Sequence, residues 1–307
     1  MIECVASTMP STAGQFLEVL TWLPEGEPKG VVQLVHGMAE HIARYDAPAR
    51  YLAQRGYVVA GHTHLGHGHM AAIQGHFADD NGWGHLVDDV DVLRNRLELA
   101  YPNLPYFLLG HSMGSFVTRC YLRDHAKGMA GCVLSGTGYF PRATVAAGLI
   151  VSGLVCRFGG AKKPSSLIDK LAFSASNKPF APNRTPFDWL SRDDAEVDKY
   201  IADPYCGFLF TGSGYRDLFR GLKRLTDTSE LRNIPKEMPL LLFSGDHDPV
   251  GNMGKGVKKV AEEFRQAGVT DVTVKLYPDG RHEMFNELNR EEVYADLAAW
   301  LDQHLPS

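Results

Sequence analysis

The sequence predicts an α/β fold, in which a mostly parallel central sheet carries helices on both faces and a helical cap insertion. Short apolar runs alternate with segments of helical period along most of the 307 residues. The runs are apolar throughout, as expected for parallel strands that are buried on both faces. This alternation stops between about residues 139 and 231, where the chain is helical and interrupted by Pro and Gly.

The expected strands are β-branched or leucine-rich runs, and Gly or Pro residues bound several of the expected helices. The run VVQLVHG, for example, ends in Gly37, and the helix that begins at residue 86 ends before Pro102. The strands are expected at 31–37, 57–63, 106–111, 131–138, 239–245 and 272–278. The helices are expected at 47–56, 86–101, 113–125, 254–268 and 291–305.

The helical segment divides the predicted fold into a core at 1–138, a cap or lid at 139–231, and a second part of the core at 232–307. Ligands of open α/β sheets bind beyond the carboxyl ends of the strands, so an insertion there covers the site. Its uncharged stretch 143–156 is shorter than the roughly 20 residues that span a bilayer. We expect a buried or interfacial helix at this stretch.

Composition argues against several functional classes. The net charge of −5 gives no support for a nucleic-acid surface. The five cysteines are odd in number and contain no CxxC pair, which predicts reduced thiols in a cytoplasmic protein. The N-terminus lacks the basic and apolar regions of a secretory signal. Nothing in the sequence implies a protein partner.

The motif GHSMG, residues 110–114, lies between an expected strand and an expected helix. A serine on such a sharp turn is held in a strained conformation with its hydroxyl exposed, so Ser112 is the candidate nucleophile. Gly110 and Gly114 remove side chains where the strand and the helix approach each other. The helix N-terminus offers free N–H groups to a developing oxyanion.

A serine nucleophile needs a general base, and the base needs an orienting carboxylate. In a fold of this type they follow the serine in the order acid, then histidine. His282 follows the strand 272–278 and is the candidate base. Asp246 and Asp248 both follow the strand 239–245, and spacing alone does not choose between them.

Two N–H groups are expected to form the oxyanion hole. One belongs to Met113, the residue after the candidate nucleophile, and the other to the loop after an early strand. That loop is HGMAEH, residues 36–41, and Met38 is the candidate donor.

These motifs together resemble the monoacylglycerol lipase and lysophospholipase group of serine α/β-hydrolases. The resemblance runs through HGMAEHIARY, THLGHGH, GHSMG, GDHDPV and GRHEMFNE, and so through nearly the whole chain. It implies the α/β-hydrolase fold, Asp248 as the triad acid, and hydrolysis of small acyl esters or lipids without a cofactor. Monoacylglycerols and lysophospholipids are the substrates that it implies.

The loop GHTHLGHGHM holds four histidines, His62, His64, His67 and His69, and raises the question of a metal site. The resemblance places His64 and His67 in the scaffold near the active site, whereas His62 and His69 are additional. The serine mechanism needs no metal, and no distant Cys or carboxylate group completes a site. We therefore expect no metal here.

The cap is weighed as an acyl-chain channel or as ordinary core packing. Leu149 in the apolar stretch, with Phe208, Phe210 and Tyr215, is a candidate for the wall of such a channel. Each buried CH₂ is worth about 0.8 kcal/mol, so an apolar channel selects acyl length. The same apolar surface suggests transient contact with a membrane or micelle.

Three alternatives to the lipase hypothesis remain open. The first is a general short-chain carboxylesterase. The second is a peptidase or amidase that releases N-terminal residues, for which Asp193, Asp194 and Glu196 in the cap are candidates to hold an α-amine. The third is a binding module without activity, which the complete set of serine, acid and histidine argues against.

Overall fold

The structure, a computed structural model, describes residues 2–306. Within that range a sheet of eight strands runs in the order β1-β2-β4-β3-β5-β6-β7-β8. The strands from β4 to β8 pair in parallel, as predicted, whereas β1 and β2 pair in antiparallel fashion. The strands are β1 Glu3–Pro10, β2 Phe16–Leu23, β3 Gly30–Val35, β4 Tyr57–His62, β5 Tyr106–His111, β6 Gly131–Ser135, β7 Leu240–Gly245 and β8 Val272–Tyr277.

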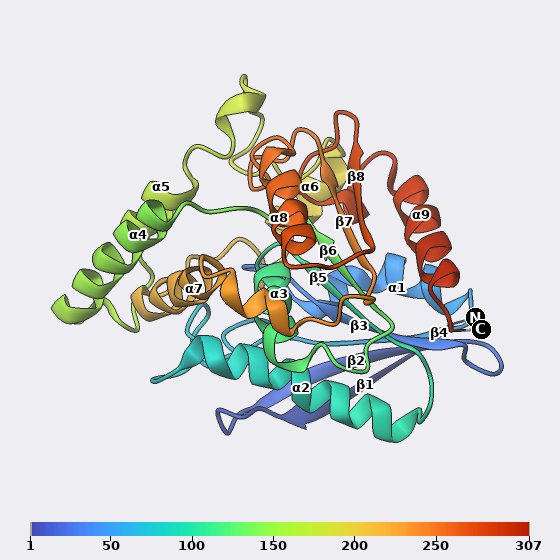
Figure 1. Cartoon of the computed structure of the whole chain (residues 1–307). Helices are drawn as coiled ribbons and strands as arrows, with labels where there is room; N and C mark the ends of the chain where they lie inside the picture. Colours follow the sequence, from blue (N-terminus) through green and yellow to red (C-terminus); the bar gives the residue numbers. More distant parts are fainter. Residues whose placement is uncertain (1, 307) are drawn as a thin grey trace.

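Helices cover both faces of the sheet (Figure 1). Side chains of α1 and α9 join one buried cluster, and side chains of α2, α3 and α8 join the other. Successive strand residues alternate between the two clusters, as Leu108 and Leu109 do in β5. These helices are α1 Asp46–Ala53, α2 Gly82–Ala100, α3 Met113–His125, α8 Lys255–Gln266 and α9 Arg290–Gln303.

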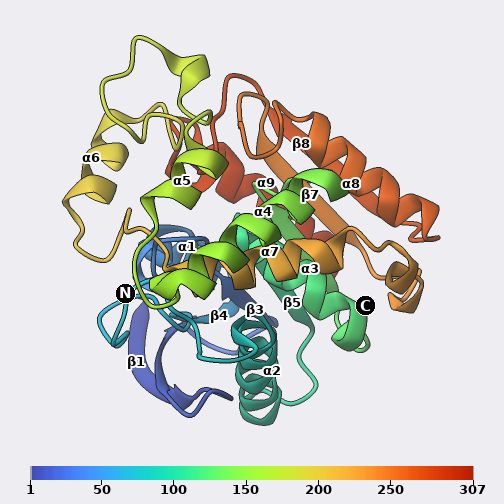
Figure 2. The same cartoon turned by 90° about the vertical axis from the view of Figure 1, so that its left-hand side faces the viewer.

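The segment between β6 and β7 contains helices and no strand of the central sheet. Figure 2 shows α4 and α7 crossing in front of the core, with α5 and α6 beside them. The helices are α4 Arg142–Val155, α5 Ser166–Phe173, α6 Asp194–Ala202 and α7 Gly212–Leu225. Buried α7 residues such as Leu218 belong to the same cluster as α3, so the segment rests on the core through α7.

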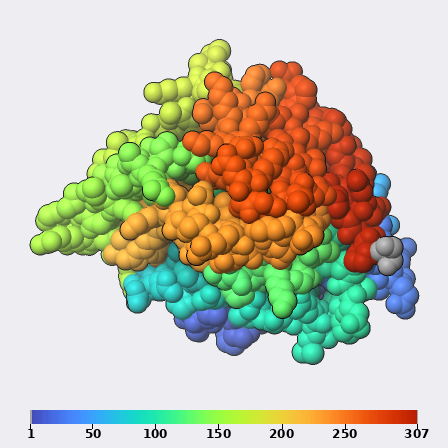
Figure 3. All heavy atoms as spheres, viewed as in Figure 1, coloured from blue at the N-terminus to red at the C-terminus, as the bar shows by residue number. Residues whose placement is uncertain are grey.

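The sequence predicted a buried or interfacial helix at 143–156, and only two residues of helix α4 are buried in the structure. A π-helical turn at Cys156–Gly160 follows α4, with non-helical backbone angles at Phe158 and Gly159. Together, Arg142–Gly160 covers 19 residues, and a window of 18 of them has a mean hydropathy of 1.5 and is 11% buried. By length and composition this helix could cross a membrane. In the fold, α4 packs on α7 with one side, and Figure 3 shows its part of the chain protruding from the body of the molecule. Most of this apolar helix is exposed because its tertiary contacts lie on one side.

The N-terminal hairpin of β1 and β2 was not among the predicted elements. Its two strands pair over their whole length, and β2 joins the sheet beside β4. Polar residues interrupt both strands, because the hairpin lies at the edge of the sheet and several of its side chains face solvent. The pattern therefore lacks the continuous apolar run that marks the parallel strands.

Candidate active site

Ser112 lies at the junction of β5 and α3 in a backbone conformation that non-glycine residues rarely adopt, with φ 52° and ψ −122°. The flanking glycines allow this turn. A Cβ at Gly114 would lie 2.0 Å from the carbonyl oxygen of Val35, and one at Gly110 would lie 2.5 Å from that of Gly114. The Ser112 N–H donates to the Ser135 carbonyl at 2.9 Å, which fixes the turn to β6.

His282 and Asp248 come from the loops that follow β8 and β7, and both are buried. The Nδ1–H of His282 donates to Asp248 Oδ1 at 3.0 Å. Asp248 also accepts hydrogen bonds from Ser244 Oγ at 2.8 Å and from the Val250 N–H at 2.9 Å. The structure therefore pairs the histidine with Asp248, the carboxylate that the family resemblance favours.

The pKa of His282 is set by two opposing effects, burial and the nearby Asp248 carboxylate. Burial lowers the pKa of His282, but the nearby Asp248 carboxylate outweighs this effect, and the net pKa is raised. The ring of His111 lies 4.8 Å from that of His282, and burial lowers the pKa of His111 to about 3. His111 is therefore neutral near pH 7 and adds no positive charge beside His282.

The two candidate oxyanion donors, Met38 and Met113, line the same cavity as Ser112 and His282. Met113 is the first residue of α3, so its N–H has no acceptor within the helix. The loop of Met38 is fixed on both sides. The Gly37 N–H donates to Glu40 Oε1 at 2.6 Å, and the Ala39 N–H donates to His67 Nε2 at 3.2 Å.

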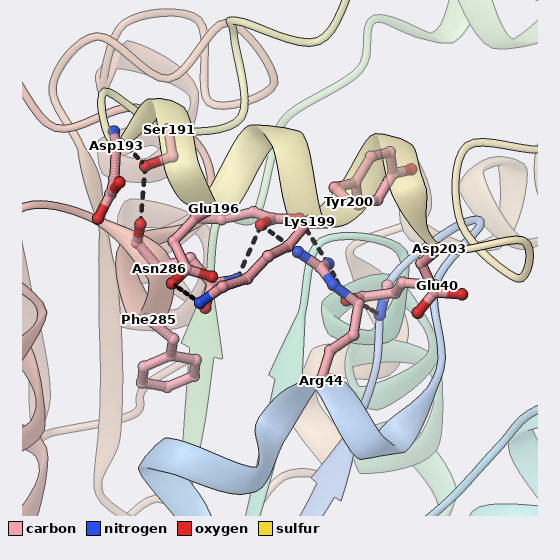
Figure 4. Close-up of polar contacts among 12 residues, drawn as sticks. Glu40, Arg44, Ser191, Asp193, Glu196, Lys199, Tyr200, Asp203, Phe285 and Asn286 are labelled. Atoms are coloured by element: carbon pink, nitrogen blue, oxygen red, sulfur yellow. Dashed lines mark hydrogen bonds and ion pairs between the residues drawn. The ribbon is translucent and has the colours of Figure 1, made fainter.

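A buried guanidinium connects the Met38 loop to the residue that follows His282. Figure 4 shows Arg44 beside Glu40 and below α6. Arg44 donates to Glu40 Oε2 at 2.6 Å and to both carboxylate oxygens of Glu283 at 2.8 and 2.7 Å, and its guanidinium lies 4.8 Å from the ring centre of Tyr200. Burial raises the pKa of the Glu283 carboxyl, but the Arg44 guanidinium outweighs this effect and lowers the pKa to about 2.

The sequence reasoning did not assign a role to this network. Glu40 and Arg44 lie within HGMAEHIARY, and Glu283 lies within GRHEMFNE, so the motifs contained the signal. The Arg44–Glu283 pair joins residues 239 positions apart, which periodicity and local motifs do not reveal.

The histidine loop supports the Met38 loop through hydrogen bonds. His67 accepts from Ala39 with Nε2 and donates from Nδ1–H to the Leu65 carbonyl at 2.9 Å. His36 accepts from the His64 N–H at 2.9 Å and donates to the Gly37 carbonyl at 2.8 Å. Burial lowers the pKa of both His36 and His67, so these rings are neutral near pH 7.

The remaining histidines of the loop have different surroundings. His64 donates from Nε2–H to the His36 carbonyl at 3.2 Å, and its Nδ1 lies 3.1 Å from Nε2 of His62. With both nitrogens engaged, His64, like His67, has none available for a metal. His69 is exposed and its Nδ1 lies 3.8 Å from the Glu18 carboxylate.

A cavity of about 830 Å³ extends from Ser112 and His282 into the segment between β6 and β7. This volume is within the usual range of small-molecule sites. The wall of the cavity away from Ser112 is largely apolar and comes from α4, α5, α7 and the segment before α7. Its members include Val145, Val151, Ile168, Leu171, Phe208, Leu218, Phe219 and Leu222.

Three of the four predicted wall residues do not line this cavity, and Phe208 does. Leu149 packs against the main core instead. Phe210 is fully buried between aromatic rings, with its ring 5.2 Å from that of Phe77. Tyr215 is also fully buried, and its hydroxyl donates to Asp169 at 2.9 Å. The prediction was wrong for these three residues because composition does not fix which side of a segment faces the cavity.

The sequence profile of the Hydrolase_4 family, described as serine aminopeptidase, S33, matches residues 26–289. The chain belongs to this family. The chain is also 30% identical over 287 residues to the monoacylglycerol lipase of Mycolicibacterium smegmatis, covering 92% of each chain. The human monoglyceride lipase is 30% identical over 298 residues, which cover 94% of this chain and 88% of the human protein.

Solved structures give the same fold. A carboxyl esterase from Bacillus coagulans, in complex with glycerol, superimposes with a TM-score of 0.92 at 29% identity over the whole of both chains. A soluble variant of the monoglyceride lipase from Saccharomyces cerevisiae superimposes with a TM-score of 0.77 at 21% identity, which supports the fold. The predictions of an α/β-hydrolase fold, of a monoacylglycerol lipase-like serine hydrolase and of a carboxylic ester hydrolase are confirmed.

Proposed function

We propose that this protein hydrolyses esters of single acyl chains, with monoacylglycerols as the preferred substrates and lysophospholipids as related ones. The observation that carries the proposal is the continuity of the cavity from Ser112 and His282 to a largely apolar wall. A single acyl chain needs such an apolar space beside a reactive serine. The names of the two relatives at 30% identity agree with this substrate class.

In the proposed mechanism, Ser112 attacks the ester carbonyl while His282 accepts the proton of the hydroxyl. Asp248 holds Nδ1–H of His282 and stabilises the imidazolium that forms, which the 3.0 Å hydrogen bond supports. His282 then protonates the leaving alcohol, for example glycerol. Water attacks the acyl-enzyme by the same route in reverse and releases the fatty acid.

The N–H groups of Met38 and Met113 are the proposed donors to the oxyanion. Removing one such donor raises the barrier by about 3 to 4 kcal/mol in serine hydrolases. Because these donors are backbone groups, their position depends on the loop around Met38. We assign Glu40 and Arg44 to holding that loop, since they connect it to Glu283.

The exposed apolar side chains of α4 and α5 suit a protein that takes its substrate from a membrane or micelle. Ile150 and Leu154 on α4 are 65% and 51% exposed, and Leu167 on α5 is 57% exposed. Leu171 is 67% exposed and also lines the cavity, so apolar surface continues from the outside into the site. We propose a cytoplasmic enzyme that contacts lipid surfaces transiently through this face.

The family description also raises the aminopeptidase alternative. The three acidic cap residues that could hold an α-amine do not line the cavity. Asp193 pairs with Arg290 at 2.8 Å, Asp194 with Arg184 at 3.2 Å and Glu196 with Lys199 at 2.7 Å. Each carboxylate already has a cationic partner, which favours an ester substrate over a free peptide.

The decisive experiment is kcat/KM on glycerol monoesters from acetyl to stearoyl, with a proline dipeptide as the peptidase control. We expect kcat/KM to rise with acyl length, and no release of proline. A maximum at the acetyl ester would replace the lipase proposal with a short-chain carboxylesterase. Release of proline at a rate comparable to ester hydrolysis would instead support the peptidase.

A second experiment tests the serine. A serine-directed phosphonate is expected to label the wild-type chain and Ser229→Ala, an exposed control serine, but not Ser112→Ala. Equal labelling of folded Ser112→Ala would reject Ser112 as the nucleophile, whatever the substrate.

A further inference from the structure

Three side chains that can bind a metal converge beside the Met38 loop. His41 lies three residues after Met38, whereas Asp203 and Cys206 lie just after α6. One ligand atom from each lies within 4.8 Å of the other two, and His41 Nε2 is 2.8 Å from Asp203 Oδ2. We propose that these residues form a binding site for a zinc-type divalent cation, which joins the Met38 loop to the cap.

The turn after α6 presents its two ligands in a defined arrangement. The Tyr205 N–H donates to Asp203 Oδ1 at 2.8 Å, and the Cys206 N–H donates to the Asp203 carbonyl at 3.1 Å. Asp203 Oδ2 is therefore left to face His41, and the thiol follows three residues later. Gly207 closes the turn with φ 68°, and its N–H donates to the Ala39 carbonyl at 3.0 Å. The backbone that carries all three ligands is thus connected by hydrogen bonds.

The combination of imidazole, carboxylate and thiol selects the kind of metal. Zn²⁺ binds all three ligand types, whereas Ca²⁺ and Mg²⁺ require oxygen ligands. Zinc–ligand bonds of about 2.0 to 2.3 Å place neighbouring ligand atoms about 3 to 4 Å apart. The cluster therefore reaches zinc geometry through small side-chain movements, in which the cation replaces the hydrogen bond between His41 and Asp203.

The surroundings of the cluster admit a cation from solvent. The side chains of His41 and Asp203 are 15% and 28% exposed, which leaves room for water as a fourth ligand. Three further charged groups act on Cys206, namely the carboxylates of Glu40 and Glu283 and the guanidinium of Arg44. With Asp203 included, carboxylates outnumber the one guanidinium, and this excess of negative charge favours a divalent cation.

Figure 4 shows Asp203 at the end of α6, in the region of Glu40 and Arg44. The segment from Tyr200 to Phe208 contributes residues to the cavity wall, and Tyr200 also donates to the Ala39 carbonyl at 3.1 Å. A metal bound to His41, Asp203 and Cys206 would hold this wall against the Met38 loop. The site is separate from the ester chemistry, which uses Ser112, His282 and Asp248 in the proposed mechanism.

The test is zinc binding by the full chain after removal of metals with a chelator and in the absence of substrate. Calorimetric titration is expected to show one Zn²⁺ per wild-type chain, with an accompanying rise in melting temperature. Cobalt is expected to give the near-ultraviolet charge-transfer band of a cobalt–thiolate bond. Cys206→Ala should lose the band and the stoichiometric binding, and Cys156→Ala, a partly buried cysteine outside the cluster, should retain both.

Two results would overturn the proposal: absence of stoichiometric zinc binding by the folded wild-type chain, or binding by folded Cys206→Ala equal to wild type. His41→Gln and Asp203→Asn provide second variants should Cys206→Ala fail to fold, and retained wild-type binding in either would also overturn it. Because the readout is metal binding, the result does not depend on which ester the protein hydrolyses.

Discussion

The burial of helices α3 and α4 is the reverse of what their compositions suggest. Eleven of the thirteen residues of α3 are buried, although the helix includes Arg119 and Arg123. Only two of the fourteen residues of α4 are buried, although it carries no charged side chain after Arg142. The more polar helix lies inside the molecule, and the more apolar one lies at its surface.

The difference follows from what surrounds each helix. The two arginines of α3 donate to backbone carbonyls of the segment between β6 and β7, Arg119 to Gly138 at 2.8 Å and Arg123 to Asp227 at 2.6 Å. Their charges are therefore satisfied in the interior. Helix α4 packs on α7 with one side, and no comparable element covers its other side. This arrangement suits a helix that faces a cavity on one side and a lipid surface on the other.

The largest expected effect lies at the N-terminus of α3. Ser112→Ala is expected to lower kcat by roughly 10⁴- to 10⁶-fold, because it removes the nucleophile of the proposed mechanism. The fold should remain intact, since Ala is smaller than Ser and the hydroxyl is not needed for the turn. The check is turnover of a soluble monoester together with a thermal melt. Substantial activity in the folded variant would contradict the assignment.

The second prediction compares two leucines directly. Leu122→Ala in α3, where the side chain is fully buried, is expected to lower the free energy of unfolding by about 2 to 5 kcal/mol. Leu154→Ala in α4, where the side chain is 51% exposed, should change it by less than about 0.5 kcal/mol. Chemical denaturation of both variants measures the two values. Equal losses would mean that α4 is covered in solution.

Sequence reasoning succeeded where one local pattern determines the structure. The expected strand 106–111 and helix 113–125 coincide with β5 and α3 as observed, because the glycines of GHSMG mark the turn between them. The order of the strands and their following loops placed His282 beside two candidate acids, Asp246 and Asp248, after strands that pair in the structure. The preference for Asp248 came from the family resemblance.

It failed where structure depends on contacts distant in sequence. A helix was expected at 143–156, but the direction of Leu149 depends on how α4 rotates against α7. The position of Arg44 depends on Glu283 in the same way. The cluster of His41, Asp203 and Cys206 had no sequence signal either, because 162 positions separate the first two residues.

The third prediction separates the two sides of α4 by introducing one charge at adjacent positions. Val151→Asp places a carboxylate in the cavity wall, and Ile150→Asp places one on the outer face. Val151→Asp is expected to lower kcat/KM for soluble long-chain esters by about tenfold or more and to spare the acetyl ester. Ile150→Asp should spare both soluble substrates.

The same pair of variants is also compared on a lipid surface, where the outer substitution is expected to have an effect of its own. Ile150→Asp is expected to weaken activity on monoacylglycerol in vesicles by about 30-fold, since an apolar side chain of this size contributes about 2 kcal/mol on burial. Vesicle co-sedimentation measures the contact independently of turnover. Identical behaviour of the two variants in both assays would mean that α4 does not have two functional sides.

The smallest expected effect is that of acid on the preference for acyl length, and it also distinguishes α3 from α4. In the proposed mechanism His282 must be neutral to accept the Ser112 proton, and its pKa is raised above its ordinary value of 6.5. As pH falls through this raised pKa, the imidazole becomes protonated and kcat/KM should fall about tenfold per pH unit.

Helix α4 carries no titratable carboxylate or imidazole, so its selection of acyl length should not change with pH. Acid should therefore lower the rates of acetyl and long-chain esters by the same factor, and pH profiles for both esters measure this. A chain-length preference that shifts across the acid limb would show that a titrating group takes part in acyl binding, and the separation between the two helices would then fail.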